Sequence, residues 1–175
     1  MAFVDRVADL FDEQHIPFAL IGAEALAVRG VPRSSYDVDL LTVDARVLSN
    51  ELWEPIRTLT NIEIRRGDLD DPLKGVVKIR PPKEKSIDVV VGRWKWQQRV
   101  IERAEPMPSE ERMLPTVTTT DLILLKLDAG GPQDAWDVTS LLAVAPEKVI
   151  AEVEERLADL KSDAKDLWQR IRRGA

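Results

Sequence analysis

The chain has 175 residues, of which 44% are hydrophobic and 32% charged, with a formal net charge of −6 and no cysteine. This composition predicts an ordinary globular protein with one core domain, or a core domain with a small helical extension. It excludes disulfide frameworks and thiolate metal sites, and the acidic net charge argues against indiscriminate binding to nucleic acid.

The beginning of the chain lacks the features of a targeting signal. Residues 1–6 include an acid and no apolar run, so we expect no signal peptide. No uncharged stretch approaches the ~18 residues that a membrane span requires. We therefore expect a cytoplasmic protein without a membrane partner.

The first elements predict a helix, a strand and a second helix. Residues 3–14 place apolar side chains at helical spacing, and residues 17–21 predict a buried strand. Gly22 then turns this strand into a predicted helix over residues 23–29. The free N–H groups and the positive dipole end of a helix favour a phosphate at such a turn. His15, the single histidine, is assigned no role, and its uniqueness excludes histidine triads and multi-histidine zinc sites.

Two carboxylates share one face of the next predicted strand. Residues 37–43 are apolar and β-branched around Asp37 and Asp39, and alternate side chains of a strand point to the same face. Two carboxylates so close repel each other unless a cation or a shared proton compensates. Oxygen ligands on a rigid strand suit Mg²⁺, which also takes waters and substrate phosphates. The pair therefore predicts a clamp for Mg²⁺ or Mn²⁺.

A third carboxylate lies in a later strand. A helix is predicted over residues 44–60 and strands over 61–65, 75–80 and 86–91, the last two as an antiparallel pair. Asp88 interrupts the apolar strand 86–91, and a charge there is costly unless it is paired or metal-bound. Two interpretations stay open: Asp88 binds a metal with the upstream pair, or it forms a salt bridge with a neighbouring Lys or Arg.

The C-terminal part predicts helices. Residues 93–103 predict a helix, 105–118 an extended connector, and 122–129 a buried helix that contains Lys126. This lysine either reaches a carboxylate or phosphate or extends its ammonium to solvent. Asp134 and Asp137 share a face of the next helix, where they either hold Lys126 or an N-terminal arginine or are surface acids. Two more amphipathic helices follow residue 146.

Basic charge is concentrated in one segment. Residues 74–103 hold nine basic and three acidic residues, so this segment carries +6 and the remainder −12. With Trp94 and Trp96, it has the charge and aromatic rings that grip a phosphate backbone and stack a base. The alternative is that these charges are solvated faces of strands and a helix, with the tryptophans in the core.

The glycine turn and the acidic strands together resemble the nucleotidyltransferase superfamily, and within it the minimal bacterial enzymes related to the abortive-infection AbiEii toxins. Gly22 and Ala23 match the family's glycine turn, Arg33 its basic residue, and Asp37 and Asp39 its paired metal ligands. Many relatives carry Ser after the glycine, where its hydroxyl touches a phosphate. Ala23 leaves only backbone amides for that contact.

The resemblance continues to about residue 142. Asp88 matches the third carboxylate of the family, and Lys126 with Asp134 and Asp137 resembles the helix pair of the toxin-like branch. The roles that the resemblance implies are catalysis and metal binding by Asp37, Asp39 and Asp88, and nucleotide binding by Gly22, Ala23, Arg33 and Lys126.

The resemblance implies an α/β fold: a mixed sheet of about five strands flanked by helices, with a nucleotidyltransferase-like core at residues 1–118 and a helical region at 119–175 packed on it. The implied activity is Mg²⁺-dependent transfer of a nucleoside monophosphate from an NTP to an acceptor hydroxyl. RNA or protein is the favoured acceptor, and a cognate antitoxin is the implied partner.

Two other functions stay open. One is a catalytically inactive nucleotide-binding or regulatory module of the same fold, which Ala23 favours and the three strand carboxylates oppose. The other is a two-metal phosphodiesterase or nuclease, in which the same carboxylates activate water. That enzyme would hydrolyse nucleic acid without any NTP.

Overall fold

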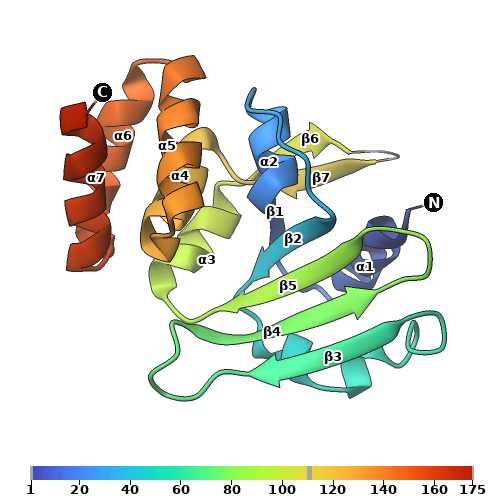
Figure 1. Cartoon of the computed structure of the whole chain (residues 1–175). Coiled ribbons are helices and arrows are strands. Elements are labelled where there is room, and N and C mark those ends of the chain that lie inside the picture. The colour runs from blue at the N-terminus through green and yellow to red at the C-terminus, as the bar shows by residue number, and fades with distance from the viewer. Residues whose placement is uncertain (1, 110–111, 175) are drawn as a thin grey trace.

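The structure, a computed structural model, describes residues 2–109 and 112–174 and is built on one mixed sheet with helices on both faces (Figure 1). The α/β class with a mixed sheet is therefore confirmed. The sheet has seven strands, however, so the expectation of about five was wrong.

The elements follow one another along the chain without a repeat. The helices are α1 (Phe3–Glu13), α2 (Gly22–Val28), α3 (Lys95–Glu102), α4 (Thr119–Ala129), α5 (Pro132–Val144), α6 (Lys148–Arg156) and α7 (Ser162–Gly174), with short 3-10 helices η1 (Ala45–Leu48), η2 (Glu51–Trp53) and η3 (Leu157–Asp159). The strands are β1 (Phe18–Ile21), β2 (Asp37–Thr42), β3 (Asn61–Arg66), β4 (Leu73–Arg80), β5 (Ser86–Gly92), β6 (Glu105–Pro108) and β7 (Met113–Thr116).

The strands are ordered β3-β4-β5-β2-β1-β7-β6 across the sheet. β2 runs parallel to β5 and antiparallel to β1, and β7 lies parallel to β1. The outer pairs are antiparallel, including β4 with β5 as expected from the short turn between them. The strands that carry the predicted site, β1, β2 and β5, are therefore neighbours at the centre of the sheet.

The two additional strands lie in the segment predicted to be an extended connector. β6 pairs with β7 antiparallel, and Pro106 lies opposite Pro115. Proline cannot donate to a strand ladder, so prolines are confined mainly to the edges of sheets. β6 is an edge strand, which tolerates this loss. The prolines that led us to expect an extended connector are therefore compatible with strands at the edge of the sheet.

The single helix predicted over residues 44–60 is wrong. The chain forms η1 and η2 followed by turns. Asp44 caps η1 by accepting a hydrogen bond from the backbone N–H of Arg46, and the indole of Trp53 donates to the carbonyl of Val47 at 2.8 Å. Pro55 lacks the N–H that a continuous helix needs. The apolar side chains are buried as predicted, but by short turns.

Each face of the sheet has its own hydrophobic core. On one face, Phe3, Val7 and Phe11 of α1 pack with Val38 and Leu40 of β2. On the other face, residues such as Ala19 and Leu41 belong to a second core that includes α4 to α7. The C-terminal helices thus share a core with the sheet. The division into regions 1–118 and 119–175 stays a prediction, although α4 does begin at Thr119.

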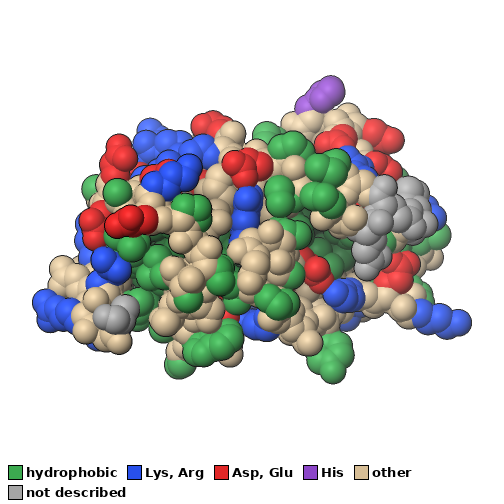
Figure 2. Space-filling view, turned by 90° about the horizontal axis from the view of Figure 1, so that it is seen from above, with side chains coloured by type: hydrophobic (Ala, Val, Ile, Leu, Met, Phe, Trp, Pro, Cys, Tyr) green, Lys and Arg blue, Asp and Glu red, His purple; other side chains and the backbone are tan. Residues whose placement is uncertain are grey.

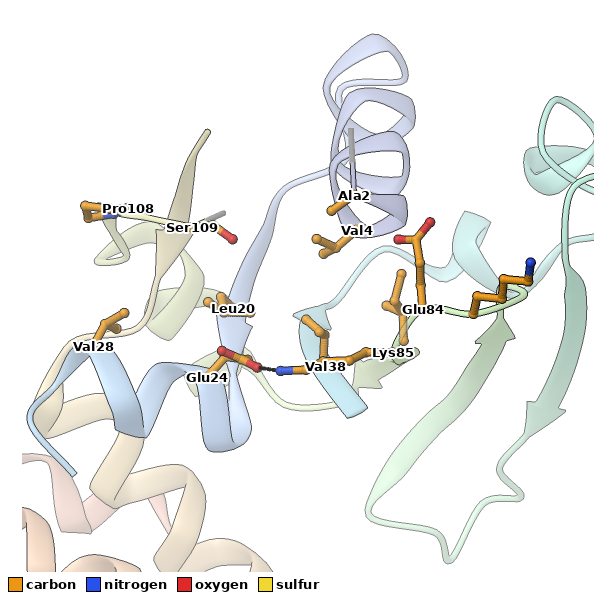
Figure 3. Close-up of a pocket in the computed structure, with 12 residues that line it drawn as sticks. Ala2, Val4, Leu20, Glu24, Val28, Val38, Glu84, Lys85, Pro108 and Ser109 are labelled. Atoms are coloured by element: carbon orange, nitrogen blue, oxygen red, sulfur yellow. Dashed lines mark hydrogen bonds and ion pairs between the residues drawn. The ribbon is translucent and has the colours of Figure 1, made fainter. Parts of the chain in front are cut away.

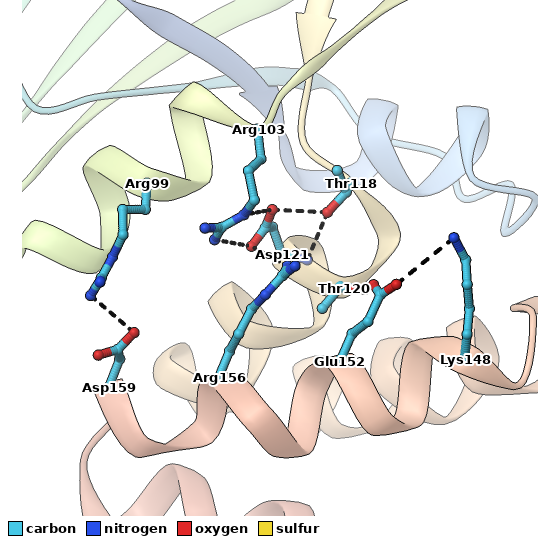
Figure 4. Close-up of polar contacts among 9 residues, drawn as sticks. All are labelled: Arg99, Arg103, Thr118, Thr120, Asp121, Lys148, Glu152, Arg156 and Asp159. Atoms are coloured by element: carbon cyan, nitrogen blue, oxygen red, sulfur yellow. Dashed lines mark hydrogen bonds and ion pairs between the residues drawn. The ribbon is translucent and has the colours of Figure 1, made fainter.

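A buried carboxylate ties the start of α4 to α3 and α6 (Figure 4). The side chain of Asp121 is fully buried and accepts two hydrogen bonds from Arg103, at 2.6 and 3.0 Å. Arg156 of α6 approaches the same carboxylate at 3.4 Å, and Thr118 donates to it at 2.9 Å. This cluster fixes the position of the helix that carries Lys126.

Among the residues that the structure describes, no helix has both the length and the apolar character needed to cross a membrane.

Candidate active site

The glycine turn touches one of the paired carboxylates directly. Gly22 has a φ of +67°, a backbone conformation that residues other than glycine rarely adopt. A Cβ added at Gly22 would collide with Oδ2 of Asp39 and lie 2.7 Å from its Cγ. Glycine is therefore required here both by the backbone and by the approach of Asp39.

The register of three strands brings the glycine turn and two carboxylates side by side. Ile21, the last residue of β1, lies opposite Asp39 of β2, and Asp39 in turn lies opposite Asp88 of β5. Asp37 is two residues before Asp39 and shares its face. The register thus places Gly22 next to Asp39 and puts all three predicted carboxylates on the face of the sheet that carries the second core.

Asp39 is the most electrostatically perturbed of these carboxylates. The pKa of Asp39 is raised from 3.8 to about 6, first by burial and then by the negative charges of Asp88 and Asp37. Lys126 and Arg33 oppose the rise. The half-buried carboxylate of Asp39 therefore lies in the field of two acids and two cations, and its negative charge is undercompensated.

Asp88 has both of the contacts considered from the sequence. It lies beside Asp39 in register, and its Oδ2 is 3.3 Å from the ammonium of Lys78 on β4. Lys78 and Asp88 are direct cross-strand partners. The salt-bridge interpretation is therefore confirmed as a contact. Asp88 still belongs with Asp37 and Asp39, because its side chain stays 22% exposed when it is paired with Lys78 and can be reached from solvent.

Arg33 and Lys126 meet on a single carboxylate. Lys126 lies 2.9 Å from Oδ1 of Asp134 and 2.9 Å from Oδ2 of Asp137, and Arg33 lies 2.8 Å from the same Oδ2 of Asp137. Burial disfavours the charged form of Lys126, but hydrogen bonds from its ammonium to Asp137 and Asp134 outweigh this and raise its pKa. The interpretation that Asp134 and Asp137 hold Lys126 and an N-terminal arginine is therefore confirmed. Lys126 and Arg33 both lie close enough to Asp39 for their charges to lower its pKa.

The donor set fits a hard divalent cation only in part. Asp37 and Asp39 form no ion pair with a cationic side chain among residues 2–109 and 112–174, so their oxygens are available. Yet in that same part of the chain no three His, Cys, Asp or Glu side chains converge closely enough to hold a metal ion. Mg²⁺ commonly takes one or two carboxylates and completes its shell with waters and phosphate oxygens. The residues present suit that arrangement.

The basic segment does not form a continuous cationic surface. Lys78, Arg80, Lys85, Arg99 and Arg103 each pair with an acid. On the face seen in Figure 2, blue and red side chains are interspersed with apolar ones, and no large patch of one sign is visible.

The two tryptophans of the basic segment differ in exposure. Trp96 is buried in the second core, which excludes it as a surface stacking ring. Trp94 is 40% exposed, and the ammonium of Lys161 lies over its ring, 5.7 Å from the centroid. The alternative of solvated faces with tryptophan in the core therefore describes most of this segment.

The partners in two ion pairs next to the site were not identified from the sequence. The partner of Asp88, Lys78, could have been found by counting back from the turn of the predicted β4–β5 pair, which places these residues opposite each other. Glu24, in the first turn of α2, pairs with Lys85. These residues are far apart in the chain, so no local sequence pattern predicts the pair. At seven residues, α2 is also shorter than most helices, so its dipole contributes little beyond the turn itself.

Sequence comparison alone identifies no relatives: no protein-family model matches the chain, and no curated protein matches it. Solved structures do share its fold. A nucleotidyltransferase-like antigen from Paracoccidioides brasiliensis superposes with a TM-score of 0.54 at 17% identity, covering 93% of this chain and 90% of that chain.

Two further solved structures of similar fold contain a bound antibiotic or an adenylylated antibiotic. The lincosamide antibiotic adenylyltransferase LnuA, bound to lincomycin, has a TM-score of 0.51 at 11% identity and covers 81% of this chain and 96% of that chain. ANT(2″)-Ia, in complex with adenylyl-2″-tobramycin, has a TM-score of 0.50 at 18% identity and covers 99% and 97%. The chain therefore has a nucleotidyltransferase-like fold.

Proposed function

We propose that this protein is a Mg²⁺-dependent nucleotidyltransferase that transfers a nucleoside monophosphate from an NTP to an acceptor hydroxyl. The observation that carries the proposal is the alignment of the glycine turn, Asp39 and Asp88 on adjacent strands, with Arg33 and Lys126 held beside them. The nucleotidyltransferase-like fold supports it.

The site residues divide between metal and triphosphate. Asp37 and Asp39 would hold Mg²⁺ or Mn²⁺, with Asp88 beside them, and the bound cation would neutralise charge on the reacting phosphates. The backbone at Gly22 and Ala23 would contact the triphosphate. Arg33 and Lys126 would place positive charge at the phosphates, prepositioned by Asp137.

The reaction requires a base and a leaving group. The acceptor oxygen would attack the α-phosphorus of the NTP, and the bond from that phosphorus to the bridging oxygen would break to release pyrophosphate. Asp88, which lies on the side of Asp39 away from the glycine turn, would accept the proton of the acceptor hydroxyl. Its pairing with Lys78 orients this carboxylate.

The acceptor and biological role are finer proposals. The sequence resemblance favours RNA or protein as the acceptor and a toxin of a toxin–antitoxin pair as the role. The mixed charges of the basic segment lend RNA little support. The fold neighbours include enzymes whose structures contain antibiotics, so small hydroxyl-bearing antibiotics form a second acceptor class to test.

Ala23 keeps a second candidate function under consideration. Its side chain is buried, at 4% exposure, and offers no hydroxyl to a phosphate. This favours the nucleotide-binding module without transfer. That module and the enzyme both bind Mg²⁺–NTP, whereas a phosphodiesterase or nuclease would not need an NTP.

The proposal is tested by thermal unfolding with each NTP, with and without Mg²⁺. A ligand at a hundred times its Kd stabilises the native state by about 2.7 kcal/mol. We expect a Mg²⁺-dependent rise in Tm that Asp39→Asn abolishes and that Asp166→Asn, on the exposed side of α7, retains. An absence of any shift with all NTPs would contradict both transfer and nucleotide binding.

A further inference from the structure

A cavity lies outside the candidate site, on the opposite face of the central strands (Figure 3). It has a volume of about 590 Å³ and lies between α1, α2 and the centre of the sheet. Its rim carries two acids, Glu24 and Glu84, and two lysines, Lys83 and Lys85. Charge at the rim therefore selects no class of ligand. The outer edge of β3, in contrast, carries a pattern of charge and hydrogen-bonding groups that fits one partner.

The two outer edges of the sheet differ in how they are protected against pairing. β3 and β6 are the end strands, so one side of each has no neighbouring strand among residues 2–109 and 112–174 (Figure 1). β6 contains Pro106 and Pro108, and proline is one of the residues that discourage pairing at an edge. β3 has six residues, an ordinary strand length, and contains no proline. The β3 edge is therefore open to a further strand.

The backbone groups of alternate residues in β3 point to this open edge. The N–H of Gly67 donates to the carbonyl of Lys74 at 2.9 Å, and these residues continue the register of β3 with β4 by one position. In an antiparallel ladder, pairs that exchange hydrogen bonds alternate with pairs that do not. The odd-numbered residues of β3 therefore bond to β4. The outward-facing N–H and C=O groups belong to the even-numbered residues, Ile62, Ile64 and Arg66.

Two opposite charges flank the centre of this edge. Glu63 and Arg65 point to the same open face of the sheet because they are two residues apart, and both are exposed. Glu63 contacts Arg80 at 3.4 Å, but both side chains are about half exposed, so this pair contributes little. Arg65 forms no ion pair in the part of the chain that the structure describes. Between them, Ile64 packs against the first core.

We propose that the β3 edge binds a second copy of this chain, antiparallel and about a two-fold axis at Ile64. This axis places Glu63 of each copy opposite Arg65 of the other, so two pairs of opposite charge form. The backbone groups agree with this register, because the two Ile64 residues exchange hydrogen bonds and Ile62 exchanges them with Arg66 of the other copy. The two copies thus share one continuous sheet.

Charge disfavours the neighbouring registers. Charged side chains on an edge usually discourage pairing, but here their alternation makes one register favourable. Moving the axis by one residue places Glu63 opposite Glu63 or Arg65 opposite Arg65, and like charges directly opposite each other destabilise a sheet. The axis at Ile64 also brings Leu59 of one copy to the end of the pairing where Leu69 of the other lies. Both leucines are exposed.

The pairing is independent of the proposed function. Glu63 lies opposite Lys78, which in turn lies opposite Asp88, so β3 and the candidate site share one face of the sheet. Residues directly opposite each other in paired strands point to the same face. The candidate sites of both copies therefore open on the same side of the joined sheet, with the two β3 strands between them.

The first experiment measures the mass of the full chain by analytical ultracentrifugation, from micromolar to near-millimolar concentration and without nucleotide. We expect an equilibrium between one and two chains. Glu63→Arg sets arginine against arginine in both pairs and should weaken dimerisation about tenfold. Asp166→Arg makes the same change of charge on the exposed side of α7 and should leave it unaltered. A wild-type chain that stays monomeric at every concentration would leave the edge to a different partner and overturn the proposal.

The second experiment mixes two variants of opposite charge. Glu63→Arg has two arginines at the centre of the edge and Arg65→Glu has two glutamates, so each should dimerise poorly alone. Mixed in equal amounts, they should form a heterodimer as tight as the wild-type dimer, because both pairs are again complementary. The double variant E63R/R65E should likewise regain self-association.

Urea unfolding of each variant shows that its monomer is folded, which is expected because both side chains are exposed. Dimers that persist in both single variants would place the interface elsewhere. A mixture of folded single variants that remains monomeric would also overturn the register at Ile64.

Discussion

At the scale of single residues, the contact between Gly22 and Asp39 is the tightest constraint on the site. The turn needs a left-handed backbone, and the carboxylate fills the space that a side chain would occupy. Gly130 offers a comparison, because it has a similar φ of +71° but its added Cβ would meet only the carbonyl oxygen of Leu127, at 3.7 Å.

We predict that Gly22→Ala destabilises the protein more than Gly130→Ala and abolishes the NTP-dependent rise in Tm. The left-handed backbone costs an alanine about 1–2 kcal/mol at either position, and the collision with Asp39 adds to this only at Gly22. Urea unfolding gives the two stability changes, and thermal unfolding with Mg²⁺–NTP gives binding. Equal losses with retained binding would show that the turn and carboxylate are not in contact.

Asp39 predicts an unusual pH dependence. Its folded pKa of about 6 lies above the model-peptide value of 3.8, so the unfolded chain releases this proton first as pH rises. Between these values the folded state holds more protons, and stability falls with increasing pH. Above pH 6 the full cost applies, on the order of 3 kcal/mol for a shift of this size.

Asp39→Asn should therefore stabilise the metal-free protein at pH 7.5, by up to about 3 kcal/mol, and much less at pH 4. Asp37→Asn, at an exposed position, should change stability little at either pH. The measurement is urea unfolding in EDTA at both values. If Asp39→Asn destabilised the protein equally at pH 4 and pH 7.5, the assigned electrostatic environment would be wrong.

The sequence was sufficient to indicate most of the residues that the structure places near one another at the candidate site. Asp37 and Asp39 share a face by the two-residue repeat of a strand, and Gly22 follows from the change of strand into helix. The joint contact of Arg33 and Lys126 with Asp137 depends on how α4 and α5 pack against the loop before β2. That geometry is tertiary, so the sequence could only offer it beside the alternative of surface acids.

At the scale of elements, the position of α4 depends on the buried cluster at its start. Asp121 accepts hydrogen bonds from Arg103 and Thr118 and approaches Arg156, so three elements converge on one carboxylate (Figure 4). Removing its charge leaves two arginines without their shared partner. Asp159, in contrast, pairs only with Arg99, and both side chains are largely exposed.

We predict that Asp121→Asn destabilises the protein by about 3 kcal/mol, in the range found when one partner of a buried pair is removed. Asp159→Asn should cost less than about 1 kcal/mol, as exposed pairs do. Chemical unfolding measures both. Similar small effects of the two substitutions would mean that the cluster does not anchor α4.

The spacing of apolar residues identified an element correctly where that spacing fits only one type of secondary structure. The β4–β5 pair follows from two alternating runs joined by a short turn. Residues 44–60 carry helical spacing, but they form η1, capped by Asp44, and η2, and Pro55 follows η2 where the chain continues in turns. β6 and β7 contain prolines, which are usually excluded from strands, and their pairing at a sheet edge depends on long-range contact with β1.

At the scale of the whole molecule, the two faces of the central strands carry two different features. One face of β1, β2 and β5 carries the turn and the carboxylates beneath the C-terminal helices, and the other face lines the cavity beside α1. The α/β class was expected from the resemblance, and the predicted strands and helices along the chain agree with it. The existence of the cavity was not predicted, because it forms between elements that no local pattern brings together.

Release of pyrophosphate is the direct sign that the proposed site transfers a nucleotide to an acceptor hydroxyl. Purified protein is incubated with NTP and Mg²⁺ alone, and with RNA, protein, aminoglycoside or lincosamide as acceptor. We predict release that requires Mg²⁺ and one acceptor class, is lost in Asp39→Asn and persists in Asp166→Asn. Nucleotide binding without pyrophosphate release for any acceptor would contradict transfer and identify a binding module.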